Sequence, residues 1–151
     1  MRILGIDPAA STGLVGYDTV LRTVFWRDTY SSRGSNLWFY RKAIEQAIVR
    51  VDPQVVVAEA VALGANRIAL VRLAEYHGVI KSVVAGRELT MVTVSPSTWR
   101  AKFKTCPKKK TTLAQRQAYL DWYEQKFRQR LASPDEVDAA LIVRTWLEKS
   151  R

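Results

Sequence analysis

The sequence Ile3-Leu4-Gly5-Ile6-Asp7-Pro8, followed by Ser11-Thr12-Gly13, decides the fold class that we expect for this chain. Its apolar residues do not alternate with polar ones, which is typical of a central strand covered on both faces. Pro8 lacks a backbone donor and favours an extended Asp7, so the strand should end there. Asp7 then lies at the carboxyl end of a buried strand, where open α/β sheets carry their active sites. Taken alone, an Asp-Pro pair more often simply closes a strand.

A second apolar run that ends in a carboxylate occurs at Gln54–Glu59. Between the two runs we expect two antiparallel strands, Gly13–Tyr17 and Leu21–Trp26, a polar loop over residues 30–35, and a helix from Ser35 or Asn36 to Val51. A right-handed crossover through that helix would place the second run parallel to the first. Neighbouring strands lie about 4.8 Å apart, so the two terminal carboxylates would face each other.

The second half of the chain predicts four helices and one strand. They are a helix over residues 66–84, a strand over 89–94, a short helix that starts at Ser95, a helix over 112–130, and a last helix that starts at Ser133. The first of these helices is apolar on more than one face, so it is either deeply buried or covered by a second subunit. The helix over 112–130 should turn an apolar side that includes Leu113 and Phe127 toward the protein.

The start of the last helix, Ser133-Pro134-Asp135-Glu136, has an N-cap serine, a proline in the first turn and two acids that the helix dipole favours. The dipole alone accounts for Asp135 and Glu136. It accounts less well for Asp138, which directly precedes an apolar stretch. Because Asp135 and Asp138 are three residues apart, both lie on one face of this helix.

Composition predicts a single domain over residues 1–151 with a polyanionic partner. The chain carries 24 Lys and Arg against 14 Asp and Glu, a net charge of +10 with a pI near 10.0. Nucleic acid is the first expectation and an acidic membrane surface the second, and basic charge kept only for solubility is the remaining alternative. Cys106 is the only cysteine and His77 the only histidine, so neither a disulfide nor a zinc site is expected, and His77 should be structural or face solvent.

The beginning of the sequence does not look like a signal peptide, and no uncharged run reaches membrane-spanning length. A cytoplasmic location is therefore expected, in a bacterium, in a phage-infected host or in an organelle matrix.

Four acids, Asp7, Glu59, Asp135 and Asp138, form the candidate site. If they converge, each close pair repels by about 4 kcal/mol at 4 Å in an effective dielectric of about 20, so the cluster must bind cations or protons. Oxygen ligands without His or Cys favour Mg²⁺, with Mn²⁺ as a substitute. Paired divalent ions serve in-line displacement at phosphorus. An acidic metal site in a basic protein indicates a nuclease.

These stretches resemble a known family. Gly5-Ile6-Asp7-Pro8 with Thr12-Gly13, Val57-Ala58-Glu59 and Asp135-Glu136-Val137-Asp138-Ala139 are similar to the three acidic motifs of RuvC-type Holliday junction resolvases. Asn66 with Gly78 and the segment Ser95–Arg100 fall between them in the same order and at similar spacing. The resemblance covers nearly the whole chain. It implies a ribonuclease H-like α/β fold with a five-stranded mixed sheet of order 3-2-1-4-5 flanked by helices.

The resemblance also implies an activity and its residues. It implies a homodimer, through the helix over residues 66–84, that nicks a four-way DNA junction symmetrically with Mg²⁺ and leaves 5′-phosphate and 3′-hydroxyl ends. The four acids would be the metal ligands, and Lys110, or its neighbour Lys109, would act near the scissile phosphate. The residues expected to bind nucleic acid are Asn66, Arg67, Arg100, Lys102, Lys104, Lys108, Lys109 and Lys110. Arg100 stands where a lysine is usual.

The sequence departs from the family at two places. Ala60–Leu63 lacks the aromatic residue that stacks into the junction, and glycines usual before the lysine loop are missing at Lys104–Pro107. Both departures concern junction opening and sequence preference rather than the cleavage chemistry.

Three other functions compete with this one. A hydrolase of RNA in RNA–DNA hybrids uses the same four carboxylates, and the fold does not separate the two substrates. A non-catalytic protein that binds branched DNA is the second. An actin-like ATPase shares the opening motif but needs two such domains and glycine-rich loops that this sequence lacks.

Overall fold

The computed structural model describes residues 1–31, 36–62, 66–104, 106–107 and 110–150. Five strands form one mixed sheet in the order β3-β2-β1-β4-β5. Their bounds are Arg2–Asp7 (β1), Ser11–Asp18 (β2), Thr23–Ser31 (β3), Val55–Glu59 (β4) and Thr90–Val94 (β5). β1 pairs antiparallel with β2 and parallel with β4, and β4 pairs parallel with β5. The strand order expected from the sequence is confirmed.

Five helices complete the described part of the chain. Their bounds are Leu37–Val51 (α1), Arg67–Ala85 (α2), Pro96–Lys102 (α3), Leu113–Phe127 (α4) and Pro134–Lys149 (α5). The residue before each helix, in order Asn36, Asn66, Ser95, Thr112 and Ser133, accepts a hydrogen bond from a backbone N–H of the first turn. These caps satisfy donors that have no partner within the helix. The start of every helix therefore follows from a local side chain.

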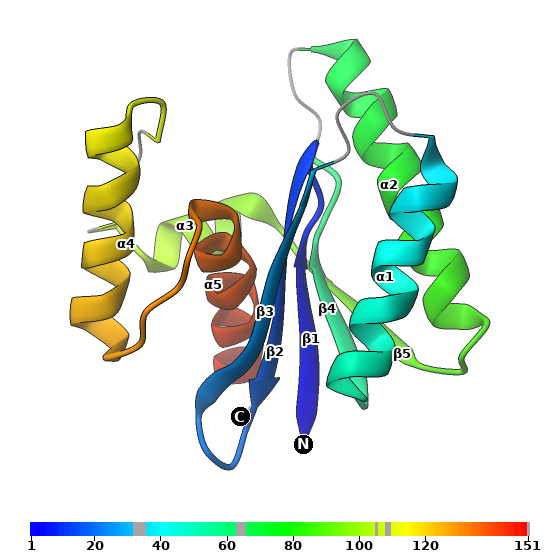
Figure 1. Cartoon of the computed structure of the whole chain (residues 1–151), viewed down its shortest axis with the longest axis horizontal. Coiled ribbons are helices and arrows are strands. Elements are labelled where there is room, and N and C mark those ends of the chain that lie inside the picture. Colours follow the sequence, from blue (N-terminus) through cyan, green and yellow to red (C-terminus); the bar gives the residue numbers. More distant parts are fainter. Residues whose placement is uncertain (32–35, 63–65, 105, 108–109, 151) are drawn as a thin grey trace.

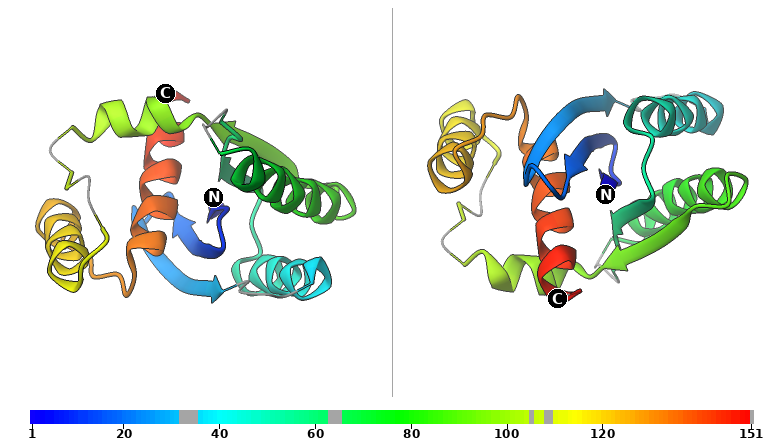
Figure 2. Two further views of the ribbon diagram at one scale, coloured as in Figure 1. Left: turned by 90° about the horizontal axis from the view of Figure 1, so that it is seen from above. Right: turned by 90° about the horizontal axis from the view of Figure 1, so that it is seen from below.

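The helices lie on both faces of the sheet (Figure 1). α1 and α2 cover one face, and α5 crosses the other face with α3 and α4 outside it, an arrangement that is also clear from above and below (Figure 2). The buried apolar residues accordingly form two clusters, one on each face. The sheet is thus the middle layer of an α/β/α sandwich.

The alternation of side chains along β1 and β4 determines which face receives the acids. Leu4 and Ile6 pack with α1 and α2, whereas Ile3 packs with α5. Successive residues of a strand point to opposite faces, so Asp7 shares the α5 face with Ile3. The same holds for Glu59, since Val57 packs with α5 and Ala58 does not. Both strand-end carboxylates therefore face α5, whose first turns carry the other two acids.

Two glycines bring α5 close to the sheet. A Cβ at Gly13 would lie 1.9 Å from the backbone oxygen of Asp135, and a Cβ at Gly5 would lie 2.9 Å from that of Ala139. Gly13 pairs with Asp7 in the antiparallel register of β1 and β2. The absence of a side chain at Gly13 thus allows the start of α5 to lie directly beside Asp7.

Several expected boundaries and faces were wrong. Tyr30 and Ser31 belong to β3 rather than to a loop, and residues 32–35 lie outside the described part. α4 ends at Phe127 because Arg128 adopts a left-handed conformation with φ of 53°. Leu113, expected on the apolar side of that helix, is 86% exposed. No helix among the described residues is both long and apolar enough to cross a bilayer.

Candidate active site

The four predicted acids come from three elements and gather at one end of the sheet. Ile6 is paired with Ala58, so Asp7 and Glu59 follow at the same level of neighbouring parallel strands. Asp135 and Asp138 lie on the first two turns of α5, which packs on this face. Asp7, Glu59 and Asp138 are buried, and Asp135 is half-buried. Each of the other three carboxylates acts electrostatically on Asp7.

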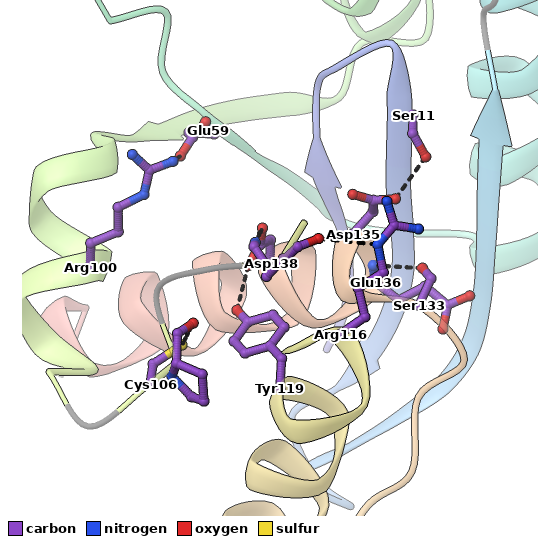
Figure 3. Close-up of polar contacts among 12 residues, drawn as sticks. Ser11, Glu59, Arg100, Cys106, Arg116, Tyr119, Ser133, Asp135, Glu136 and Asp138 are labelled. Atoms are coloured by element: carbon purple, nitrogen blue, oxygen red, sulfur yellow. Dashed lines mark hydrogen bonds and ion pairs between the residues drawn. The ribbon is translucent and has the colours of Figure 1, made fainter. Parts of the chain in front are cut away.

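Three of these carboxylates have polar partners of their own (Figure 3). Asp138 accepts hydrogen bonds from the Lys110 ammonium and the Tyr119 hydroxyl. Asp135 accepts one from the Ser11 hydroxyl, with Oγ and Oδ2 2.7 Å apart. We find no hydrogen bond or ion pair to the Asp7 carboxylate within the described residues. Asp7 is therefore the acid of the four whose carboxylate has no hydrogen-bonded partner in the described residues to offset the repulsion of the other three.

Glu59 is the most firmly positioned acid. The Trp99 indole N–H donates to Glu59 Oε1 at 2.7 Å in a buried environment, and the Arg100 guanidinium lies 3.5 Å from the same oxygen. The backbone oxygen of Glu59 is 2.5 Å from Nε2 of the buried His77. His77 is thus a structural residue, and the β4 terminus is fixed through both its backbone and its side chain.

Burial and mutual repulsion shift the titration of the strand-end acids. Burial raises the pKa of Asp7 well above its usual range, and the neighbouring charges of Asp138, Glu59 and Asp135 raise it further, against a lowering effect of Lys110. Burial also raises the pKa of Glu59, although the Trp99 hydrogen bond and Arg100 oppose the shift. A cation placed between the carboxylates would offset their repulsion and lower the pKa of both groups.

The donor set fits a hard divalent cation by its chemistry. It consists of carboxylate oxygens alone, as Mg²⁺ and Mn²⁺ prefer. Among the residues that the structure describes, however, no three acidic, histidine or cysteine side chains form a ready-made coordination group. Lys110 holds Asp138 and Arg100 holds Glu59. The Lys110 ammonium and the Arg100 guanidinium therefore occupy two of the carboxylates that a metal ion would share. The metal-binding role of Asp7, Glu59, Asp135 and Asp138 stays a prediction.

The predicted basic residues separate into different environments. Lys110 and Arg100 contact the acids, as described above, and Lys104 is exposed next to them. Lys102 instead forms an ion pair with Glu148 at the end of α5. Asn66 caps α2 through its side chain, which explains it without nucleic acid, and Arg67 is exposed in the first turn. Lys108 and Lys109 lie outside the described residues.

Sequence reasoning missed the residues that hold the acids. Trp99 and Tyr119 donate to Glu59 and Asp138, but in the sequence they are indistinguishable from core aromatics. Glu136, attributed to the helix dipole, is buried, accepts a hydrogen bond from Ala132 N–H at 2.7 Å and pairs with Arg27 at 3.7 Å. One signal was available for Trp99: α3 starts directly after β5, so its first turns must lie near the end of β4.

Replacing Trp99 with Phe is expected to weaken Mn²⁺ binding about 10–100-fold, which is typical for partners that orient metal ligands. Phenylalanine keeps an aromatic ring but cannot donate to Glu59. Trp146→Phe is the matched control, since Trp146 packs against the same core cluster but lies about two turns further along α5 than Asp138. Titration of free Mn²⁺ by electron paramagnetic resonance measures the affinity. Equal losses in both variants would mean that Trp99 only fills space.

In the presence of a chelator, Asp7→Asn is expected to raise the melting temperature at neutral pH. An acid whose pKa is raised by folding binds its proton more tightly in the folded state, so its contribution to stability falls as pH rises from about 4 through the folded pKa. Asparagine removes this effect. A gain of about 1 kcal/mol corresponds to roughly 2–4 °C in a chain of this size. Calorimetry at pH 7 and pH 4 tests this: the gain should vanish at pH 4, and a variant less stable than wild type at pH 7 would contradict it.

No protein-family model matches the chain, and no curated protein matches it significantly in sequence. Solved structures do match. RuvC from T. thermophilus in complex with a Holliday junction substrate has a TM-score of 0.77 at 12% identity, covering 100% of this chain and 95% of that one.

Two further resolvases share the architecture. The fowlpox virus Holliday junction resolvase has a TM-score of 0.60 at 13% identity, with 99% of each chain covered. The yeast mitochondrial Holliday junction resolvase Ydc2 has a TM-score of 0.58 at 13% identity, covering 97% of this chain and 77% of that one. At such identities the likeness establishes the fold. The chain therefore has the ribonuclease H-like fold of RuvC-type Holliday junction resolvases.

Proposed function

We propose that this protein is a metal-dependent endonuclease that resolves four-way or other branched DNA junctions by paired, symmetric nicks. The observation that carries the proposal is the placement of Asp7, Glu59, Asp135 and Asp138 on one face of the sheet, at one end, in a fold shared with resolvases. The net charge of +10 supports a polyanionic substrate. One of the matching structures contains a Holliday junction, which supports branched DNA as that substrate.

The four carboxylates would hold Mg²⁺, with Mn²⁺ able to substitute. When bound, the metal would supply a nucleophilic water and stabilise the leaving oxygen, giving 5′-phosphate and 3′-hydroxyl ends. The chain's own residues would position the phosphate. Lys110 lies at Asp138 and would bring a positive charge to the non-bridging oxygens, and Arg100 at Glu59 would do the same from the other side. Trp99 and Tyr119 would hold Glu59 and Asp138 in place.

A second copy of the chain is part of the proposal, because paired nicks need two sites. The starts of α1 and α2 expose large apolar residues: Leu37 (38%), Trp38 (55%), Phe39 (54%), Ile68 (75%) and Val71 (58%). Contiguous exposed apolar surface is typical of an association site. Ile80, further along α2, is fully buried against α1 and the sheet, so the exposed large apolar residues of α2, Ile68 and Val71, lie in its first half.

Replacing Val71 with Asp is therefore expected to yield monomers and to uncouple the two nicks. A charge in the centre of an apolar interface must be desolvated or leave the interface open. Val49→Asp is the matched control, because Val49 is 64% exposed near the C-terminal end of α1, about three turns from Trp38. Sedimentation velocity measures the association state. If both variants sedimented as wild type does, this surface would not be the dimer interface.

The function is tested with purified protein on a labelled four-way junction, a linear duplex and an RNA–DNA hybrid, each with Mg²⁺ and with a chelator. Paired nicks at symmetric positions in the junction alone, only with Mg²⁺, are expected. Cleavage of the hybrid's RNA strand instead would identify the alternative hydrolase. Junction binding without any cleavage would identify a non-catalytic binding protein. A cytoplasmic location remains part of the same proposal.

A further inference from the structure

A cavity of about 830 Å³ lies next to the acids, between α3 on one side and Pro107, Lys110 and Tyr119 on the other. Three basic side chains line it, Arg100, Lys104 and Lys110, together with apolar surface that includes Phe103, Pro107 and Tyr119. No acidic side chain is among its described lining residues. Its volume is typical of pockets that enclose a small organic ligand.

The walls of this cavity are shared with the candidate site. Lys110 and Tyr119 contact Asp138, and Arg100 and Trp99 contact Glu59 while also lining the cavity. A strand whose phosphate reaches the carboxylates from the side of α3 would therefore pass the rim of the cavity. The nucleotide that then lies at the rim would belong to the same strand and be directly next to that phosphate.

The lining indicates the chemical class of the occupant. A free phosphate would leave the apolar lining exposed, whereas an apolar ligand would cover Lys104, which forms no ion pair among the described residues, and would not use the outer sides of Arg100 and Lys110. A nucleotide satisfies both, because it joins a charged phosphate to a flat base with low polarity on its faces. Rotating a base out of the stack costs a few kcal/mol in duplex DNA and least where pairing is already disturbed, as at a branch point.

We propose that this cavity receives one nucleotide of the cleaved strand, adjacent to the scissile phosphate, with its base rotated out of the helix. The proposal rests on the function proposed above. It gives the protein a way to read base identity beside the cut, and it favours branched over regular duplex DNA, since a fully stacked strand must break its stacking to enter.

The experiment places 2-aminopurine, whose fluorescence rises when it leaves the stack, on either side of the mapped cleavage position of a four-way junction. Wild-type protein is added in a chelator, so that the DNA is bound but not cut. A rise of at least about threefold is expected at one flanking position and not at the other or at a position several nucleotides away. Ala101→Trp fills the cavity from the exposed surface of α3, so it should abolish the rise and reduce the preference among the four bases at that position to within about twofold.

Val49→Trp, an equally bulky change at an exposed position near the end of α1 that does not line the cavity, should keep both the rise and the preference. A protein that cuts junctions normally, yet gives no rise at either flanking position, would overturn the cavity's role and leave the proposed function standing. Retention of the wild-type rise by Ala101→Trp would overturn the cavity's role in the same way. A protein that neither binds nor cuts a junction would overturn both proposals.

Discussion

Asp7→Asn is expected to reduce Mg²⁺-dependent junction cleavage more than about 100-fold while leaving the affinity for the junction within about twofold of wild type. Asp7 ends β1, and the charges of the three other carboxylates all act on it. Even residues that only orient metal ligands typically contribute about 10–100-fold, so loss of a ligand should exceed that range. Binding should survive because it depends on basic side chains, none of which the substitution touches. Single-turnover rates and gel-shift affinities measure the two quantities.

Asp28→Asn provides the matched control. It removes the same charge from the exposed part of β3, where the Asp28 carboxylate accepts a hydrogen bond only from the neighbouring Thr29 N–H in the described residues. Its cleavage rate should stay within about twofold of wild type. If Asp7→Asn cut as fast as Asp28→Asn, the strand-end acid would have no part in the chemistry.

Gly13→Ala is expected to have the second largest effect, on both stability and activity. The added methyl carbon would overlap the backbone of Asp135, 1.9 Å from its oxygen, and backbone cannot rotate away as a side chain can. Overpacking of this kind typically costs about 1–3 kcal/mol. The start of α5 must move away from the sheet, taking Asp135 and Asp138 with it, and a displacement of about 1 Å in a catalytic group can cost about 100-fold in rate.

Gly78→Ala is the control for the glycine itself. Gly78 lies inside α2 with no atom within 4 Å of an added Cβ, so alanine there should stabilise the helix by up to about 1 kcal/mol and leave cleavage unchanged. The melting temperatures of the two variants should therefore change in opposite directions, and the cleavage rate should fall only in Gly13→Ala. Gly13→Ala behaving like Gly78→Ala would show that α5 does not need its close approach to β2.

The sheet and the positions of the acids could be predicted because they depend on local signals. Pro8 ends β1 after Asp7, the apolar runs identify the central strands, and Ser133-Pro134 starts α5 just before its two aspartates. The handedness of the crossover then places Asp7 beside Glu59. Each of these steps uses residues close together in the sequence or a general rule of chain topology.

The contacts that hold the acids could not be predicted, because they join residues far apart in the chain. Tyr119 and Asp138 are 19 residues apart and Glu59 and Trp99 are 40 apart, and nothing in an aromatic residue's own neighbourhood indicates a buried acceptor. Which apolar residues of α2 are buried could not be predicted for a related reason. Ile80 and Val71 are both apolar, and only the position of α1 decides that Ile80 is buried and Val71 is exposed.

The central claim, that Asp7, Glu59, Asp135 and Asp138 together bind divalent metal, is tested most directly by counting Mn²⁺ ions on the purified protein by electron paramagnetic resonance. Wild-type protein should bind two ions per chain, and Asp7→Asn should lose at least one of them, with Asp28→Asn binding as wild type does. If Asp7→Asn bound as many ions with the same affinity as wild type, the four carboxylates would not form a shared metal site.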